Sequence, residues 1–166
     1  MSVLAWWAGK THRVRVHLTA RVSLAERAGL ATLLSPRELA LFDSLHVADR
    51  RHGIVVRDAL LAAGERDPDL LVAALLHDAG KGPRTGLAPR IAWALGERHG
   101  TAIHAVALRI PGLRGGVARM RDHVVVSARL AAEAGARPRV VALIAAQSAP
   151  EEPAARALHL ADEAAG

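Results

Sequence analysis

A run of seven consecutive apolar residues, Leu70 to Leu76, constrains the fold of this chain more than any other feature. Asp67-Pro68 precedes the run as a helix cap followed by a proline at the first helical position. A helix that is apolar almost all round has to be buried on most sides. The run ends at His77-Asp78, and two glycines and a proline up to Pro83 predict a helix terminus and a turn. We therefore expect a central helix that other helices surround.

The composition also favours closely packed helices. Apolar residues make up 51% of the chain, but there are only three Trp, one Phe and no Tyr, so Ala, Leu and Val must fill most of the core. Ala and Leu are good helix formers, and small side chains let helices approach one another closely. A length of 166 residues suits one domain with a single core. Because no convincing strand pattern of period two is present, the predicted fold class is all-α, a compact helical bundle.

Local capping signals mark where further helices begin. Ser23 with Glu26, and Ser35 with Glu38, each form an S-x-x-E capping box. Apolar periodicity between Gly and Pro breaks predicts more helices over residues 48–63, 89–98, 101–110, 117–134, 137–147 and from 153 to the C-terminal end. Gly115-Gly116 is expected to interrupt the chain just before the long helix.

The formal charge of +6 suggests nucleic-acid binding, because basic surfaces attract phosphate backbones. However, Lys10 and Lys81 are the only lysines among 22 basic residues, and arginines scattered along a chain are typical of a GC-rich genome. The tightest basic stretch, Lys10 to Arg21, has no Phe or Tyr for base stacking. Nucleic acid is therefore not expected as a partner. We divide the chain into a basic N-terminal segment, residues 1–22, and one helical domain, residues 23–166.

Nothing in the sequence predicts a membrane protein or an exported one. Residues 3–8 are apolar but too few for a signal-peptide core, and no basic region precedes them. No run approaches the roughly 20 apolar residues of a membrane span. The absence of cysteine excludes disulfides and thiolate metal ligands. A cytoplasmic protein is expected, and the oligomeric state stays open.

His77 and Asp78 are the residues with the clearest chemical potential. Burying two such side chains without partners is costly, and a divalent cation would satisfy both through imidazole nitrogen and carboxylate oxygen. The alternative is a solvated helix end, at which Asp78 pairs with Lys81 or Arg84. The dipeptide alone does not decide between the two.

The residues Ala73 to Lys81, AALLHDAGK, resemble the signature A-x-L-L-H-D-x-G-K of the HD-domain superfamily. The resemblance covers the chain from about Leu41 to the C-terminus, and residues 49–81 are similar to small stand-alone bacterial members. It implies a helical bundle that holds one divalent ion (Mn, Fe, Ni, Co or Mg) through an H…HD…D set of ligands. The residues that match this set are His52, His77, Asp78 and Asp162.

Two of these four assignments have competitors. His46 also lies upstream of the HD pair, but its spacing to His77 is long for two compact helices, which favours His52. Glu163 is a register alternative to Asp162, and the aspartate is favoured because the family ligand is Asp.

The resemblance also implies catalytic roles. Asp78 would bind the metal and orient an attacking water, and Lys81 would hold a phosphate oxygen. The simpler interpretation of Lys81 is a cation at a helix C-terminus. His123 is a candidate ligand for substrate phosphate or for a second metal, although Ala145 and Ala146, where relatives often carry histidine, favour one metal. The other histidines are expected at the surface or in helix caps: His12, His17, His99, His104 and His159.

Together these residues predict a metal-dependent phosphohydrolase that acts on a nucleotide or another phosphate ester through a metal-activated water. The alternative is a non-catalytic module of the same fold that binds a nucleotide or regulates another activity. Either way, the expected partner is a phosphorylated small molecule or a nucleotide.

Overall fold

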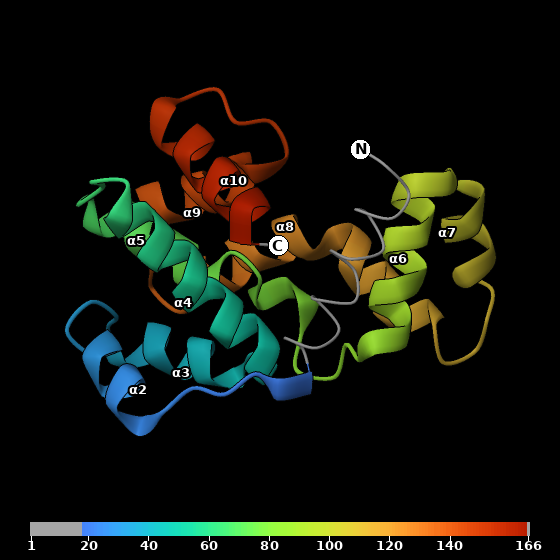
Figure 1. Ribbon diagram of the computed structural model, residues 1–166, viewed down its shortest axis with the longest axis horizontal. Helices are drawn as coiled ribbons and strands as arrows, with labels where there is room; N and C mark the ends of the chain where they lie inside the picture. The colour runs from blue at the N-terminus through green and yellow to red at the C-terminus, as the bar shows by residue number, and fades with distance from the viewer. Residues whose placement is uncertain (1–17, 166) are drawn as a thin grey trace.

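A computed structural model describes residues 18–165, and every regular element among them is helical (Figure 1). The predicted all-α class is therefore confirmed. The α-helices before α9 include α2 (Leu24–Leu30), α3 (Pro36–Ser44), α4 (Val47–Ala62), α5 (Pro68–Leu76), α6 (Leu87–His99), α7 (Ala102–Ala107) and α8 (Arg114–Glu133), and the last is α10 (Pro153–Ala165). Two short 3₁₀ helices are η1 (Ala79–Lys81) and η2 (Ala146–Ser148). A further helix, α9, spans Pro138–Ala145 and leads directly into η2.

The predicted caps are present at the starts of α2 and α3. Ser23 accepts a hydrogen bond from the Glu26 backbone, and the Glu26 side chain accepts one from the Ser23 backbone, which completes the first capping box. Ser35 and Glu38 form the second box in the same way. Because these bonds join residues three apart, the sequence alone locates them.

The apolar helix α5 lies at the centre of the core. All seven residues from Leu70 to Leu76 are buried. Helices α3, α4, α9 and α10 pack against it, with α9 and α10 on one side of the bundle and α2 and α3 on the other (Figure 1). The single phenylalanine, Phe42 of α3, is fully buried in this core.

Helix α8 begins three residues earlier than predicted, and Gly115-Gly116 lies inside it rather than breaking the chain. The reason is a tight contact with α6. A Cβ atom on Gly116 would lie 2.3 Å from Cγ of Pro89, so glycine is needed there for close packing. The prediction that His104 is a surface or capping residue is also wrong, because its ring stacks on Trp93 with centroids 4.1 Å apart.

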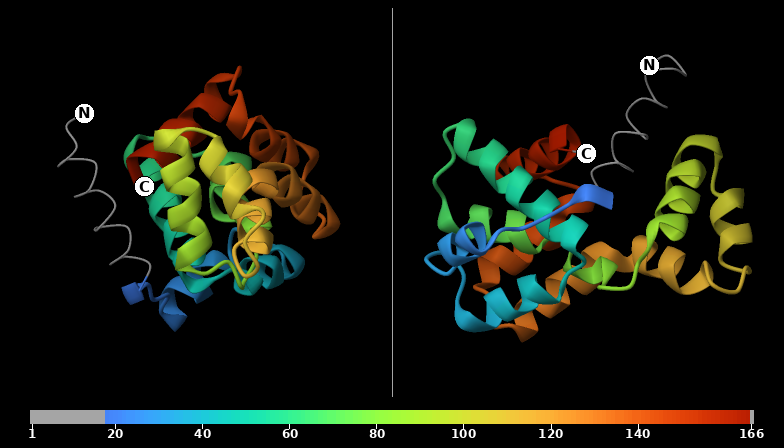
Figure 2. Two further views of the ribbon diagram at one scale, coloured as in Figure 1. Left: turned by 90° about the vertical axis from the view of Figure 1, so that its right-hand side faces the viewer. Right: turned by 60° about the horizontal axis from the view of Figure 1, so that its bottom comes forward.

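Helices α6 and α7 form a hairpin that stands to one side of the bundle, and α8 runs from this hairpin into the bundle (Figure 2). The hairpin is tied to α4 by a bidentate ion pair. Arg90 of α6 donates to both carboxylate oxygens of Asp49, at 2.8 and 2.6 Å. Asp49 lies one turn before His52 on α4, so this ion pair joins the hairpin to the helix that carries a predicted ligand.

The predicted basic segment, residues 1–22, falls mostly outside the described residues, because residues 1–17 and 166 are not described. Its boundary with a domain over residues 23–166 stays a prediction. Between residues 18 and 165, no helix combines the length and the apolar character needed to cross a membrane.

Candidate metal centre

Helices α4 and α5 approach each other closely at Gly53, the residue after His52. A Cβ atom there would lie 3.1 Å from the Leu75 carbonyl oxygen, which leaves little room for a larger side chain. This approach places the rings of His52 and His77 with centroids 5.3 Å apart, edge to face. The pair His52-Gly53 therefore supplies both a candidate ligand and the room for it to reach the end of α5.

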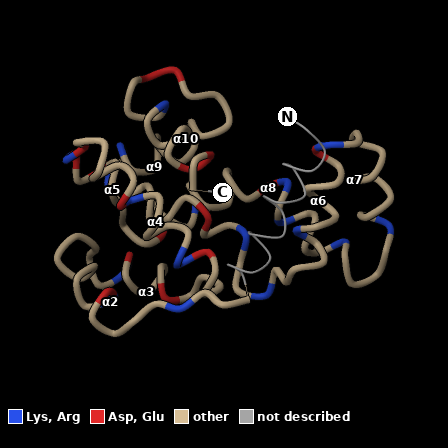
Figure 3. The backbone as a smooth tube through the Cα atoms, in the orientation of Figure 1, with Lys and Arg blue, Asp and Glu red and all other residues tan. Residues whose placement is uncertain are grey.

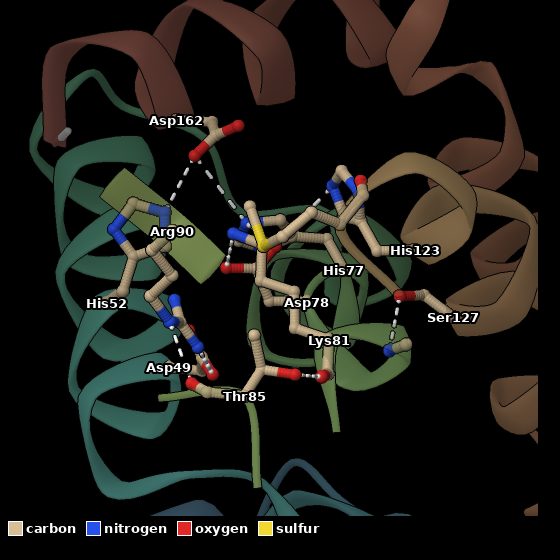
Figure 4. Close-up of polar contacts among 12 residues, drawn as sticks. Asp49, His52, His77, Asp78, Lys81, Thr85, Arg90, His123, Ser127 and Asp162 are labelled. Atoms are coloured by element: carbon tan, nitrogen blue, oxygen red, sulfur yellow. Dashed lines mark hydrogen bonds and ion pairs between the residues drawn. The ribbon is translucent and has the colours of Figure 1, made fainter. Parts of the chain in front are cut away.

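His77 caps the C-terminal end of α5, and its side chain is only 1% exposed. Its Nδ1–H donates to the carbonyl of Ala74 at 2.8 Å, which leaves Nε2 to face the interior. Nε2 is buried and has no hydrogen-bond partner. It lies 3.5 Å from an oxygen of Asp78 and 3.5 Å from an oxygen of Asp162 (Figure 4).

Asp162 of α10 reaches the same place from the opposite end of the chain. Its Oδ1 accepts a hydrogen bond from His52 Nε2 at 2.7 Å, and its Oδ2 accepts one from Gln147 Nε2 at 3.1 Å. The side chain is 31% exposed, less than expected for an aspartate on a fraying helix end. Glu163, the register alternative, is 65% exposed and faces His159 instead.

These side chains form a donor set that fits a divalent ion. One ligand atom each from His52, His77 and Asp162 lies within 4.8 Å of the other two. Two imidazole nitrogens and one carboxylate oxygen suit Mn, Fe, Co, Ni or Zn. The unpartnered Nε2 of His77 is the strongest sign of a cation site, because a buried polar atom without a partner is costly.

Asp78 faces a second group of residues beside this set. Its Oδ2 lies 2.5 Å from Lys81 Nζ, and its Oδ1 lies 3.9 Å from His123 Nε2. Asp78 therefore pairs with Lys81, as one interpretation of the sequence predicted. The pair does not lie at a solvated helix end, because the Asp78 side chain is only 3% exposed. His123 lies in the middle of α8, and its Nδ1–H donates to the Met120 carbonyl at 2.7 Å.

The charges of the centre reinforce one another. Burial opposes the charged form of His77, but Asp78 and Asp162 outweigh burial and raise its pKa to about 8. Burial likewise opposes ionisation of Asp78, but Lys81 and His77 hold its pKa well below the ordinary value. Burial also opposes ionisation of Asp162, but the hydrogen bond from His52 and the charge of His77 hold its pKa well below the ordinary value. Both carboxylates are therefore anionic at neutral pH and ready to hold a cation.

Burial lowers the pKa of His123, so its imidazole is neutral near pH 7. Because Nδ1 carries the proton that Met120 accepts, Nε2 presents a lone pair towards Asp78. This ring nitrogen is thus available as an acceptor next to the candidate metal centre.

A glycine also sets the distance between η1 and α8. A Cβ atom on Gly80 would lie 2.2 Å from the carbonyl oxygen of His123, so only glycine fits without movement. The Gly80 amide donates to the hydroxyl of Ser127 at 2.8 Å. These contacts hold Asp78 and Lys81 beside His123.

Sequence reasoning missed several residues that support the site. Gln147 positions Asp162, and its own side chain is 6% exposed. Arg90 pairs with Asp49 and also donates to the carbonyl of Thr85 at 3.1 Å. No local pattern marks these partners, because each pair joins helices that are distant in sequence. His46, the competitor of His52, accepts a hydrogen bond from the Ala48 amide and caps α4.

The model of the HD domain family matches residues 17–165, nearly the whole chain, so the protein belongs to the HD domain family. Members of this family are generally metal-dependent phosphohydrolases and bind divalent metals. A search of curated proteins and a search of solved structures each gave no match.

Proposed function

We propose that this protein is a metal-dependent phosphohydrolase that acts on a nucleotide or another phosphorylated small molecule. One observation carries the proposal: the buried, unpartnered Nε2 of His77, which faces His52, Asp78 and Asp162. Membership of the HD domain family supports the same class of activity.

In this proposal His52, His77 and Asp162 hold one divalent ion, and Asp78 lies next to it. When bound, such an ion supplies Lewis-acid polarisation of a phosphoryl oxygen and lowers the pKa of a coordinated water. The Nδ1–H of His77, fixed by the Ala74 carbonyl, keeps the lone pair on Nε2 as a ligand requires. Gln147 orients Asp162 by its bond to the second carboxylate oxygen.

The neighbouring residues act on the substrate and on the attacking water. Lys81 Nζ supplies positive charge for phosphoryl oxygens, where charge develops in the transition state. Asp78 Oδ1 accepts a hydrogen bond from the water and so orients it. His123 Nε2, with its lone pair directed towards Asp78, takes up the proton of that water.

Hydrolysis and metal content are measured together on the same preparations. Purified protein is loaded with Mn, Fe, Co, Ni or Mg, and metal is counted by elemental analysis. Turnover is then followed on p-nitrophenyl phosphate, bis(p-nitrophenyl) phosphate and a panel of nucleotides. We expect about one ion per chain, loss of that ion in His77→Gln, and a loss of turnover of at least about a hundredfold in Asp78→Asn.

His159→Gln and Asp122→Asn are the matched controls, because both side chains lie at the surface with a single charged neighbour. Both should keep metal and turnover. A metal-loaded protein that binds a nucleotide, but hydrolyses nothing in the panel, would support the non-catalytic module and refute the hydrolase. Absence of bound metal in the wild type would refute both the centre and the mechanism.

A further inference from the structure

The positive charge of this protein is concentrated in one part of the chain. Residues 81–121 contain eight of the 22 Lys and Arg residues and only one of the 16 Asp and Glu residues, which is a formal charge of +7. The rest of the chain has 14 basic and 15 acidic residues, a formal charge of −1. Residues 81–121 are called the basic stretch below. The arginines are spaced along this stretch, and its high charge follows from the near absence of Asp and Glu.

Three arginines of the basic stretch flank the helix ends that lie at one end of the α6–α7 hairpin. Arg84 lies in the loop before α6, Arg109 follows α7, and Arg114 is the first residue of α8. The start of α6, the end of α7 and the start of α8 lie at the same end of the hairpin (Figure 2). Figure 3 shows Lys and Arg positions around this end, with few acidic positions nearby.

The side chains of these three arginines are exposed and form no ion pair or hydrogen bond with any residue from 18 to 165. Many other arginines on the described surface are neutralised by a carboxylate. Those that form such pairs are Arg27, Arg51, Arg57, Arg129, Arg137 and Arg139. The end of the hairpin is thus a region of uncompensated guanidinium charge.

The same charge continues from the hairpin to the metal centre. Arg119 of α8 donates through Nε to the hydroxyl of Thr85 at 2.7 Å, and its side chain passes beside Gly82. Lys81 lies on the other side of Gly82 and contacts Asp78. Basic residues therefore form a track from the candidate active site to the exposed end of the hairpin.

We propose that this basic track binds the phosphate backbone of single-stranded nucleic acid. Guanidinium groups match phosphate oxygens in a planar, bidentate way, and unpaired exposed arginines gain most from such contacts. The choice of a single strand rests on the proposed function. The side chains of His52 and Asp162 are only 20% and 31% exposed. A flexible single strand can enter such a recessed site, whereas a stiff duplex cannot.

The chemistry of the track predicts binding without base preference. Trp93 is the only Trp, Phe or Tyr in the basic stretch, and its ring is already stacked on His104. No aromatic platform is left there for bases, so contacts are made with phosphates and depend strongly on salt. The exposed large apolar residues here are too few to form the broad apolar face with which helices enter a lipid surface; they are Ile91, Val106 and Ile110, 44%, 56% and 43% exposed.

Binding of a fluorescein-labelled 20-nucleotide RNA and the matching DNA is measured by anisotropy on full-length, metal-loaded protein from about 50 to 200 mM salt. The test variant is Arg84→Gln/Arg109→Gln/Arg114→Gln. With about 0.7 released counterions per contact, we expect the salt slope to fall by about 2 and the affinity to fall at least about tenfold. The variant Arg84→Lys/Arg109→Lys/Arg114→Lys should keep most of the slope. Thermal melting checks that each variant is folded.

Two controls remove the same charge elsewhere. Arg37→Gln/Arg66→Gln/Arg156→Gln changes exposed arginines outside the basic stretch that pair with no described carboxylate. Lys10→Gln/Arg13→Gln/Arg15→Gln changes residues that lie outside the described part of the chain. Both should change affinity less than about twofold.

The proposal is overturned if the wild type binds neither oligonucleotide at low salt, or if either control loses as much affinity as the test variant. Tighter binding to a duplex, or to vesicles that contain phosphatidylserine, would overturn it as well. Oligonucleotide cleavage is scored separately on gels. Strand binding without turnover on any phosphoester would leave this inference standing while the proposed hydrolase fails.

Discussion

At the residue scale, His77 is expected to couple the candidate metal centre to pH. Its pKa of about 8 in the metal-free protein means that a proton occupies the imidazole at neutral pH. A metal ligand must be neutral, so the proton competes with the ion. We expect metal affinity to rise about tenfold per pH unit below pH 8 and to level off above it. Calorimetric titrations from pH 6 to 9 measure this, and a flat profile would show that His77 is not a ligand.

The same residue determines part of the stability of the metal-free protein. Because folding raises the pKa of His77 from 6.5 to about 8, its contribution is complete below pH 6.5 and is lost as the pH rises through 8. The difference corresponds to about 2 kcal/mol of the free energy of unfolding. Denaturant unfolding in the presence of a chelator should show this decrease, and His77→Gln should remove it.

Gln147 is the clearest test of a positioning role. Its amide holds the outer oxygen of Asp162, so Gln147→Ala leaves the three ligands in place but frees the carboxylate to rotate. Loss of such an outer hydrogen bond weakens metal affinity by about 10- to 100-fold. Equilibrium dialysis against a metal buffer measures the change. Unaltered affinity in this variant would mean that Gln147 only fills space in the core.

At the element scale, the contact between η1 and α8 depends on Gly80. A methyl group there would meet the backbone of His123 and the amide of Ser127, neither of which can move freely. We expect Gly80→Ala to destabilise the protein by about 2 kcal/mol and to reduce turnover, because Asp78 and Lys81 shift away from His123. Gly29→Ala is the matched control, since nothing lies within 4 Å of its added Cβ. Gly29→Ala should stabilise α2 by about 0.5 kcal/mol. Equal changes in the stability of the two variants would show that the contact between η1 and α8 does not require glycine at position 80.

The ion pair between Asp49 and Arg90 holds α6 against α4. Asp49 is 4% exposed and Arg90 17% exposed, so breaking the pair leaves a buried charge without a partner. Asp49→Ala should cost about 3 kcal/mol in chemical denaturation. The exposed pair of Arg129 and Glu133 provides the comparison, and Glu133→Gln should cost less than about 0.5 kcal/mol. A small cost at Asp49 would mean that the hairpin is held by its apolar contacts alone.

At the scale of the whole molecule, the candidate metal centre joins helices that are distant in sequence. His52 and Asp162 are 110 residues apart in sequence, and a bound ion would link α4, α5 and α10. An ion at 100 times its dissociation constant adds about 2.7 kcal/mol to stability. The melting temperature should therefore rise by roughly 5–10 °C with metal. No rise is expected for His77→Gln, and an equal rise in that variant would place the ion elsewhere.

The sequence by itself determined the helices and the family of the protein. Capping boxes, prolines and apolar periodicity are local signals, so the helices began close to where Ser23, Ser35 and Asp67 placed them. The HD signature rests on nine consecutive residues, which is why the family was recognisable without any tertiary information. That the four predicted residues bind metal stays a prediction.

Only the tertiary structure decided how these residues meet. The close approach at Gly53 decides that His52, and not His46, faces His77. The hydrogen bond from Gln147 to Asp162 depends on the packing of η2 against α10. The start of α6, the end of α7 and the start of α8 lie at the same end of the hairpin, an arrangement that no local pattern contains. The physical reason is the same in each case: periodicity and capping act over a few residues, whereas these contacts join helices that are distant in sequence and are set by packing.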